Sequence, residues 1–144
     1  MARRGPPLSL VLDSSVTLAW LYADETTPAV RAVFDRLVRA GAWVPSLWRL
    51  EVANSLHRAT LRSRINDVFR DESLTDLDLL PISIDLETDR QAWGATLQLA
   101  AASGLTLYDA SYLELAIRRT LPLASLDEEL RRAAKTSGVR LMGL

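Results

Sequence analysis

The sequence predicts an α/β fold of three layers, in which a parallel sheet of short strands lies between two layers of helices. Short apolar runs alternate along the chain with longer segments whose apolar residues recur at helical spacing. Helices of that length between strands act as crossover connections, which join parallel strands and cover both faces of the sheet. The 144 residues suit one core. We therefore expect a loose tail at residues 1–7 and a single domain at residues 8–144.

The first half of the chain shows the start and stop signals of these elements. An apolar run at residues 8–12 is the first expected strand, and Asp13 ends it and opens a helix to about residue 22. Thr27 before a proline opens a second helix, which Gly41 ends. The second strand is expected at residues 42–45.

The second half continues the alternation to the end of the chain. The expected elements are a helix from Ser46 to 61, a helix from Asn66 to about 80, a strand at 81–84, a helix at about 86–102 closed by Gly104, a helix at 108–119, a strand at 121–124, a helix through 134 closed by Gly138, and a strand at 139–141. Residues 125–128 have the spacing of a capping box before the last helix. The pattern is therefore βα throughout.

Composition excludes several classes of function. The chain has no cysteine and a single histidine, His57, so it has no disulfide framework and no cysteine or multi-histidine metal site. Any metal must be held by oxygen. The net charge of -1 gives no overall basic field of the kind that marks many nucleic-acid binders. Lys135 is the only lysine, which removes most chemistry that needs a phosphate-gripping or Schiff-base lysine.

No segment has the pattern of an export signal or of a membrane span. The apolar run at residues 8–12 ends at Asp13, before it reaches the length of a signal core. The longest uncharged run, residues 91–108, contains glutamine, serine, threonine and glycine, which is typical of a buried helix and a loop. We expect a cytoplasmic protein that makes no membrane contact.

Four carboxylates stand among apolar residues, where an unpaired charge is costly. Asp13 and Asp127 follow expected strands, and Glu51 and Asp109 lie in the first turns of helices. In an open parallel sheet, ligands bind beyond the carboxyl ends of the strands, so the same edge can gather all four acids. Clustered carboxylates repel one another unless a cation lies between them. Hard oxygen ligands without sulfur or imidazole select Mg²⁺ or Mn²⁺.

Each acid also has a purely structural explanation. The two acids that follow strands could be plain helix caps. Glu51 could pair with Arg49 or Arg58 along its helix, and Asp109 could oppose the positive end of its helix dipole. These explanations do not account for the position of all four acids at one expected edge of one sheet.

Four motifs that contain these acids resemble the motifs of PIN domains, most closely those of VapC-type toxin ribonucleases. The motifs are LSLVLDSSVTLAW (8–20), LEVANSL (50–56), TLYDASYL (106–113) and LASLD (123–127), and they follow the family order over nearly the whole chain. The resemblance implies a three-layer α/β/α PIN-like fold and an endoribonuclease that depends on Mg²⁺ or Mn²⁺. It also implies a homodimer and a cognate VapB-type antitoxin, whose tail occupies the active-site cleft.

The resemblance assigns roles to individual residues. It implies a quartet of catalytic and metal-binding acids: Asp13, Glu51, Asp109 and Asp127. It implies three polar residues that support the acids: Ser14, Asn54 and Ser125. The fourth motif departs from the usual pattern, because Ser125 stands where relatives often have threonine and Glu128 follows directly after the fourth acid.

The reaction expected of such a site is hydrolysis of an RNA phosphodiester by in-line attack of water, with one or two metal ions. An acidic site repels a polyanion, so RNA binding needs basic residues nearby. The candidates lie on the helices that carry Glu51 and Asp109: Arg58, Arg62, Arg64, Arg118 and Arg119. Each of these arginines could instead belong to a solvated helix face. Tyr112 and His57 are expected to be structural.

The alternative function is a non-catalytic PIN-like scaffold that binds RNA or a protein partner. Other phosphate-handling enzymes fit less well. A haloacid-dehalogenase phosphatase needs a second aspartate where Ser15 stands and a lysine in mid-chain, and a phospho-receiver domain needs the same lysine. The sequence contains no glycine-rich phosphate loop of the Walker or Rossmann type. DNA and structured RNA stay open as substrates, because phosphate chemistry does not inspect the 2′-hydroxyl.

Overall fold

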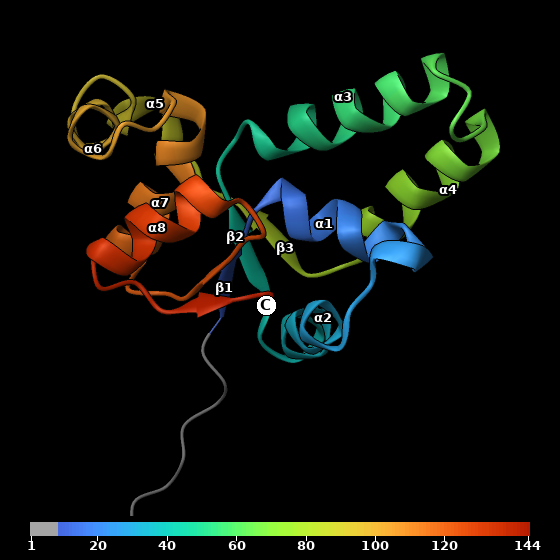
Figure 1. The fold of residues 1–144 in the computed structure, drawn as a ribbon, viewed down its shortest axis with the longest axis horizontal. Coiled ribbons are helices and arrows are strands. Elements are labelled where there is room, and N and C mark those ends of the chain that lie inside the picture. Colours follow the sequence, from blue (N-terminus) through green and yellow to red (C-terminus); the bar gives the residue numbers. More distant parts are fainter. Residues whose placement is uncertain (1–8) are drawn as a thin grey trace, which may run out of the picture.

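The computed structural model describes residues 9–144 and contains a five-stranded parallel sheet with helices on both faces (Figure 1). The strands are β1 (Leu10–Leu12), β2 (Ala42–Val44), β3 (Ile82–Ile84), β4 (Leu123–Ala124) and β5 (Leu141–Met142), in the spatial order β3-β2-β1-β4-β5. Every pairing is parallel. The predicted three-layer fold is confirmed. The expected tail at 1–7 lies outside the described residues.

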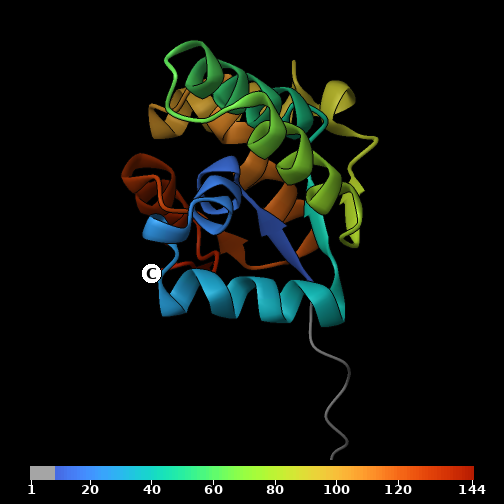
Figure 2. The same cartoon turned by 90° about the vertical axis from the view of Figure 1, so that its right-hand side faces the viewer.

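The helices divide between the two faces according to the strands that they connect. The first group is α1 (Ser14–Leu21), the 3₁₀ helix η1 (Ala23–Glu25), α2 (Pro28–Ala40), α3 (Trp48–Leu61) and α4 (Asp67–Asp78). The second group is α5 (Thr88–Gln91), α6 (Ala95–Ser103), α7 (Leu107–Arg119) and α8 (Glu128–Thr136). Figure 2 shows α1, α2 and α4 in front of the strands and α7 behind them. Within residues 9–144, no helix combines the length and the hydrophobicity that crossing a membrane requires.

The centre of the core is β1, which has β2 on one side and β4 on the other. Its residues Leu10, Val11 and Leu12 are all fully buried, as expected of a parallel strand covered by helices on both faces. Leu113 and Leu115 of α7 are also fully buried and belong to the same cluster. The core therefore centres on β1 and on α7, which packs against it.

Several predicted helix starts are confirmed by side-chain hydrogen bonds. Thr27 caps α2 by accepting from the backbone N–H of Val30 at 3.1 Å, and Asn66 caps α4 by accepting from the N–H of Phe69 at 2.8 Å. Each of these bonds satisfies a backbone donor that the helix itself leaves unpaired. The helix starts are therefore encoded locally.

Other boundaries differ from the sequence prediction. The single helix expected at 86–102 is two helices, because the backbone of Gly94 (φ −116°, ψ −107°) leaves the helical region. The helix expected to start after Ser46 begins at Trp48, since a turn in which the Trp48 N–H donates to the carbonyl of Pro45 precedes it. The last strand is Leu141–Met142 rather than 139–141.

Gly41 and Gly104 form a matched pair for testing the backbone at helix ends. Gly41 has φ 74° and ψ 175°, and an added Cβ would lie 3.2 Å from the carbonyl oxygen of Pro81. Gly104 has φ 69° and ψ 22°, and an added Cβ would meet nothing within 4 Å. We expect Gly41→Ala to lower the free energy of unfolding by roughly 2–3 kcal/mol and Gly104→Ala by about 1 kcal/mol. Urea denaturation measures both, and equal losses would contradict this account.

Candidate active site

Four acids gather at the edge of the sheet where β1 and β4 end. The strand order reverses direction between β1 and β4, and ligand sites of open α/β sheets form at such switch points. Asp13 follows β1, and its backbone N–H donates to the carbonyl of Ala124 at 3.0 Å. Asp127 follows β4 on the adjoining loop. Glu51 and Asp109 reach this region from the first turns of α3 and α7.

Two serine hydroxyls hold the carboxylate of Asp13. Ser15 Oγ and Ser125 Oγ donate to its Oδ2 at 2.7 Å and 2.8 Å. Each hydroxyl also accepts from a backbone N–H after β4, that of Leu126 at 2.9 Å and that of Asp127 at 3.1 Å. Because each oxygen accepts from an amide, its own proton is available to the carboxylate. The loop after β4 is thereby fixed to the end of β1.

Glu51 has a tyrosine partner and, among residues 9–144, no arginine partner. The hydroxyl of Tyr112 donates to Glu51 Oε1. The pairing with Arg49 or Arg58 that the sequence also allowed does not occur, since Arg49 forms an exposed ion pair with Asp78 at 2.9 Å. The charge of Glu51 is therefore balanced by no cation of its own helix.

Burial and neighbouring carboxylates raise the pKa values of Asp13, Glu51 and Asp109. Burial and the charge of Asp127 raise the pKa of Asp13, and the hydrogen bonds from the two serine hydroxyls lower it, with a raised pKa as the net result. Burial also raises the pKa of Asp109, as do the charges of Asp127 and Asp13. Burial and the charges of Asp13 and Asp109 raise the pKa of Glu51, and the hydrogen bond from Tyr112 opposes this shift. The four carboxylates therefore share one electrostatic environment that favours a cation.

Asp127 also serves as a helix cap. Its Oδ1 accepts from the backbone N–H of Leu130 at 2.8 Å, so Asp127 and not Ser125 caps α8, which corrects the predicted capping box. Asp13 stands at the N-cap of α1 but makes no side-chain cap bond there. The cap explanation thus applies to Asp127 and not to Asp13.

The four acids offer only carboxylate oxygens, which are the ligand type that Mg²⁺ and Mn²⁺ prefer. No member of the quartet forms an ion pair within residues 9–144. The side-chain hydrogen bonds to Asp13 all end on Oδ2, so Oδ1 has no side-chain partner among these residues. In the same residues no three acids converge closely enough to enclose an ion. Mg²⁺ needs no such cage, because it usually keeps several waters and takes one or two carboxylates.

The expected supporting residues are only partly at the acids. Ser125 holds Asp13, as described above, but the hydroxyl of Ser14 lies beside that of Tyr112. Asn54 is exposed and makes no side-chain hydrogen bond within the described part of the chain. Sequence reasoning missed Ser15 and assigned no site role to Tyr112. The available signal for Tyr112 was its position one helical turn after Asp109.

A basic groove lies between the C-terminal parts of α1 and α3. Arg58, Arg62 and Arg64 line it together with Leu18 and Tyr22, and its volume is about 250 Å³. The groove runs between α1 and α3, which both begin at the acidic edge. A wider opening of about 950 Å³ adjoins it at the turn between α3 and α4, and no acid of the quartet lines that opening. No acid of the quartet lines the basic groove either, so the groove is a separate feature from the acidic edge.

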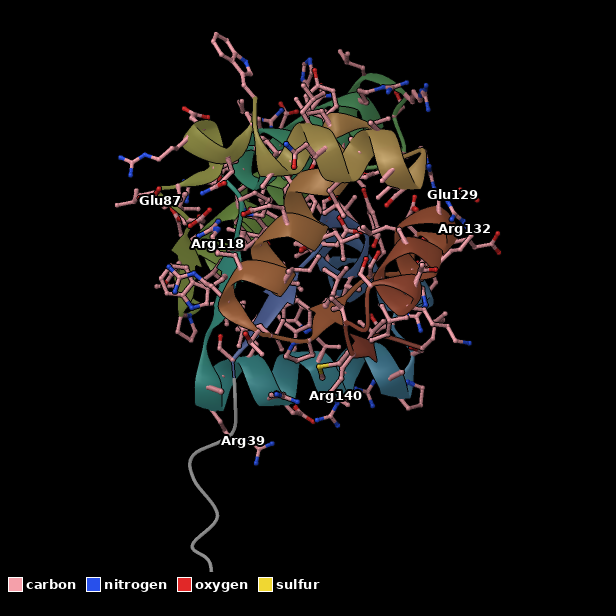
Figure 3. All side chains as sticks on the ribbon, turned by 90° about the vertical axis from the view of Figure 1, so that its left-hand side faces the viewer. Arg39, Glu87, Arg118, Glu129, Arg132 and Arg140 are labelled. Carbon is pink, nitrogen blue, oxygen red and sulfur yellow. The ribbon has the colours of Figure 1, made fainter. Side chains whose placement is uncertain are left out.

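Arg118 lies outside this groove, on α7 (Figure 3). Its guanidinium donates to the carboxylate of Asp85 at 3.2 and 2.6 Å and to Glu114 at 2.7 Å. Asp85 is 1% exposed, and although burial raises its pKa, the bonds and the charge of Arg118 lower it overall. Arg119 stacks over the ring of Trp43 at 3.5 Å. Both arginines are thus engaged within the fold.

Comparisons with known proteins agree with this architecture. Residues 10–136 match the PIN domain family. PAE2754 from Pyrobaculum aerophilum has a similar crystal structure, with a TM-score of 0.68 and 24% identity over 94% of this chain and 84% of that chain. A chain in the crystal structure of VapBC2 from Rickettsia felis, which is bound to a DNA fragment from the VapBC2 promoter, has a TM-score of 0.62 and 12% identity. The match covers 93% of this chain and 97% of that chain. No curated protein matches the chain.

Asp13 is buried without an ion-pair partner among residues 9–144, so we expect a neutral residue at this position to stabilise the metal-free protein. Without metal at pH 7.5, Asp13→Asn should raise the free energy of unfolding by on the order of 1 kcal/mol. Asparagine can accept the same serine hydroxyls and suits the N-cap position, but it carries no buried charge. A carboxyl whose folded pKa is raised loses stability as the pH rises from its ordinary range through the raised value, so the gain should shrink toward pH 4.

Thermal unfolding in EDTA at pH 4.5 and pH 7.5 measures this difference. Asp76→Asn is the control, because Asp76 is exposed on α4 and makes no ion pair with the described part of the chain. Its melting temperature should follow that of the wild type at both pH values. An Asp13→Asn protein less stable than the wild type at pH 7.5 would contradict the prediction.

Proposed function

The chain belongs to the PIN domain family, and we propose that it is a metal-dependent endoribonuclease, the toxin of a VapBC-type toxin-antitoxin pair acting in the cytoplasm. The observation that carries the proposal is a set of acids whose pKa values burial and neighbouring carboxylates raise, and which form no ion pair within residues 9–144. The similarity in fold to a chain of VapBC2 supports the toxin-antitoxin part. The partners that we propose are RNA, a VapB-type antitoxin and a second copy of the chain.

In the proposed reaction, Asp13 and Asp109 hold Mg²⁺ or Mn²⁺, with Glu51 and Asp127 beside them. Such an ion, when bound, lowers the pKa of water and neutralises charge on the phosphoryl oxygens. Glu51 accepts the proton of the attacking water, for which a raised pKa is suitable. Asp127 adds negative charge while its Oδ1 caps α8. Ser15 and Ser125 keep Asp13 in place.

RNA binding in this proposal depends on the groove of α1 and α3. Arg58 lies in the last turn of α3 and Arg62 directly follows that helix, both beyond Glu51 along the chain, so they can contact phosphates on one side of the scissile bond. Arg118 is left out of this role, because Asp85 and Glu114 take its donors. The groove supplies the positive charge that the acidic edge lacks.

A non-catalytic scaffold is the second candidate function. The observation that favours it is that no three acids within residues 9–144 converge closely enough to enclose an ion. A scaffold would leave the partly buried charges of Asp13, Glu51 and Asp109 without any compensating role, which is costly. The two candidates differ in whether the acids are needed for RNA cleavage.

We expect the wild-type protein to cleave single-stranded RNA in the presence of Mg²⁺, and we expect EDTA to abolish this cleavage. Asp13→Asn and Asp109→Asn should each lower the rate by roughly 100-fold or more, since ligand loss removes several kcal/mol of transition-state stabilisation. Glu128→Gln is the matched control, because Glu128 is exposed beside Asp127 and has no assigned role in the site. Equal cleavage by all variants, or cleavage in EDTA, would contradict the proposal. Circular dichroism checks that each variant folds.

The groove arginines give a separate prediction. Arg58→Ala and Arg62→Ala should each raise KM for RNA, leave kcat close to the wild-type value, and reduce the slope of log affinity against log salt by about 1. Arg39→Ala is the control, because Arg39 is exposed near the end of α2 and does not line the groove (Figure 3). Kinetics at several salt concentrations measure the effect. The same change in Arg39→Ala would show that only general charge matters.

A further inference from the structure

We propose that Tyr112 is a positioning residue for Glu51, an inference that rests on the proposed function. Tyr112 is fully buried and is the largest such side chain among residues 9–144. Its hydroxyl donates to Glu51 Oε1, and the hydroxyl of Ser14 lies beside it. The phenol thus reaches from the core of the fold to a half-buried acid of the candidate site.

The bond joins the two helices that carry Glu51 and Asp109. Within residues 9–144 it is the only side-chain hydrogen bond between α3 and α7. Tyr112 lies one helical turn after Asp109, and such residues share a helix face. The position of Glu51 relative to Asp109 therefore depends on the phenol.

The bond also selects which oxygen of Glu51 is available. A phenol hydroxyl donates a single proton, so it engages one carboxylate oxygen. With Oε1 engaged by Tyr112, Oε2 accepts no side-chain hydrogen bond from the described residues. Oε2 is then the oxygen that Glu51 offers to a cation or to water. Hydrogen bonds that orient a ligand in this way typically change metal affinity or activity by 10–100-fold when lost.

The same bond has a structural explanation, because a buried hydroxyl needs a partner. Glu51 would serve that need even if it played no part in metal binding. The two roles predict different results. A structural bond affects only the stability of the fold, whereas a positioning bond affects metal affinity, and does so through the carboxylate of Glu51.

The test compares Tyr112→Phe with Tyr108→Phe in the full chain. Tyr108 lies on the same helix, but it is 65% exposed and its hydroxyl makes no hydrogen bond to any residue that the structure describes. Titration of the metal-free protein with Mn²⁺ in a calorimeter should show affinity weaker by on the order of 10-fold in Tyr112→Phe and unchanged in Tyr108→Phe. RNA cleavage by Tyr112→Phe should show a similar loss in kcat with KM unchanged, since the groove arginines are intact.

A double-variant comparison separates positioning from general damage. In a Glu51→Gln background, Tyr112→Phe should cause no further loss of Mn²⁺ affinity, because the residue through which it acts is already altered. Wild-type Mn²⁺ affinity in Tyr112→Phe, or an equal loss in both backgrounds, would overturn the inference. If Mn²⁺ binding responds as expected but no RNA is cleaved, the proposed function fails and the positioning role stands. A wild-type protein that binds no Mn²⁺ overturns both.

Discussion

The burial of one carboxylate at the end of the central strand is the constraint on which the site depends. Strand β1 is apolar and fully buried, and Asp13 follows it directly with 5% exposure. A charge in that position needs compensation, and the chain supplies it with two serine hydroxyls rather than a cation. Those hydroxyls also bind backbone amides after β4. One polar residue therefore determines how the loop that carries Asp127 is held.

The chain treats its two groups of buried acids differently. Asp85 and Glu114 share the guanidinium of Arg118, and the pKa of Asp85 is lowered. Asp13, Glu51 and Asp109 receive only neutral donors, and their pKa values are raised. Within residues 9–144, the fold thus compensates Asp85 and Glu114 with an arginine but places no arginine or lysine against the acids at the switch point of the sheet. Acids without such a fixed cationic side chain are suited to bind a metal ion that can enter and leave.

Side-chain hydrogen bonds hold Asp13 and Glu51 in place at the acidic edge. Each donor hydroxyl comes from a buried or partly buried residue and engages one oxygen of its carboxylate, which leaves the other oxygen of Asp13 and of Glu51 free of side-chain donors in the described residues. The basic groove is built differently, from exposed arginines in the last turn of α3 and in the turn that follows it. Acids held by hydrogen bonds suit chemistry that needs fixed geometry, whereas exposed arginines suit substrate binding that needs only charge.

The sequence by itself determined the order of strands and helices, because apolar period and capping residues act over a few neighbours, as at Thr27 and Asn66. It also placed four acids at one edge, since the carboxyl ends of parallel strands coincide. Only the tertiary structure decided that Ser15 rather than Ser14 holds Asp13, that Tyr112 binds Glu51, and that Asp85 takes Arg118. The Tyr112–Glu51 and Arg118–Asp85 bonds join residues that are 61 and 33 positions apart in the chain. Their partners depend on the rotation of each helix about its axis, which packing fixes and local pattern does not.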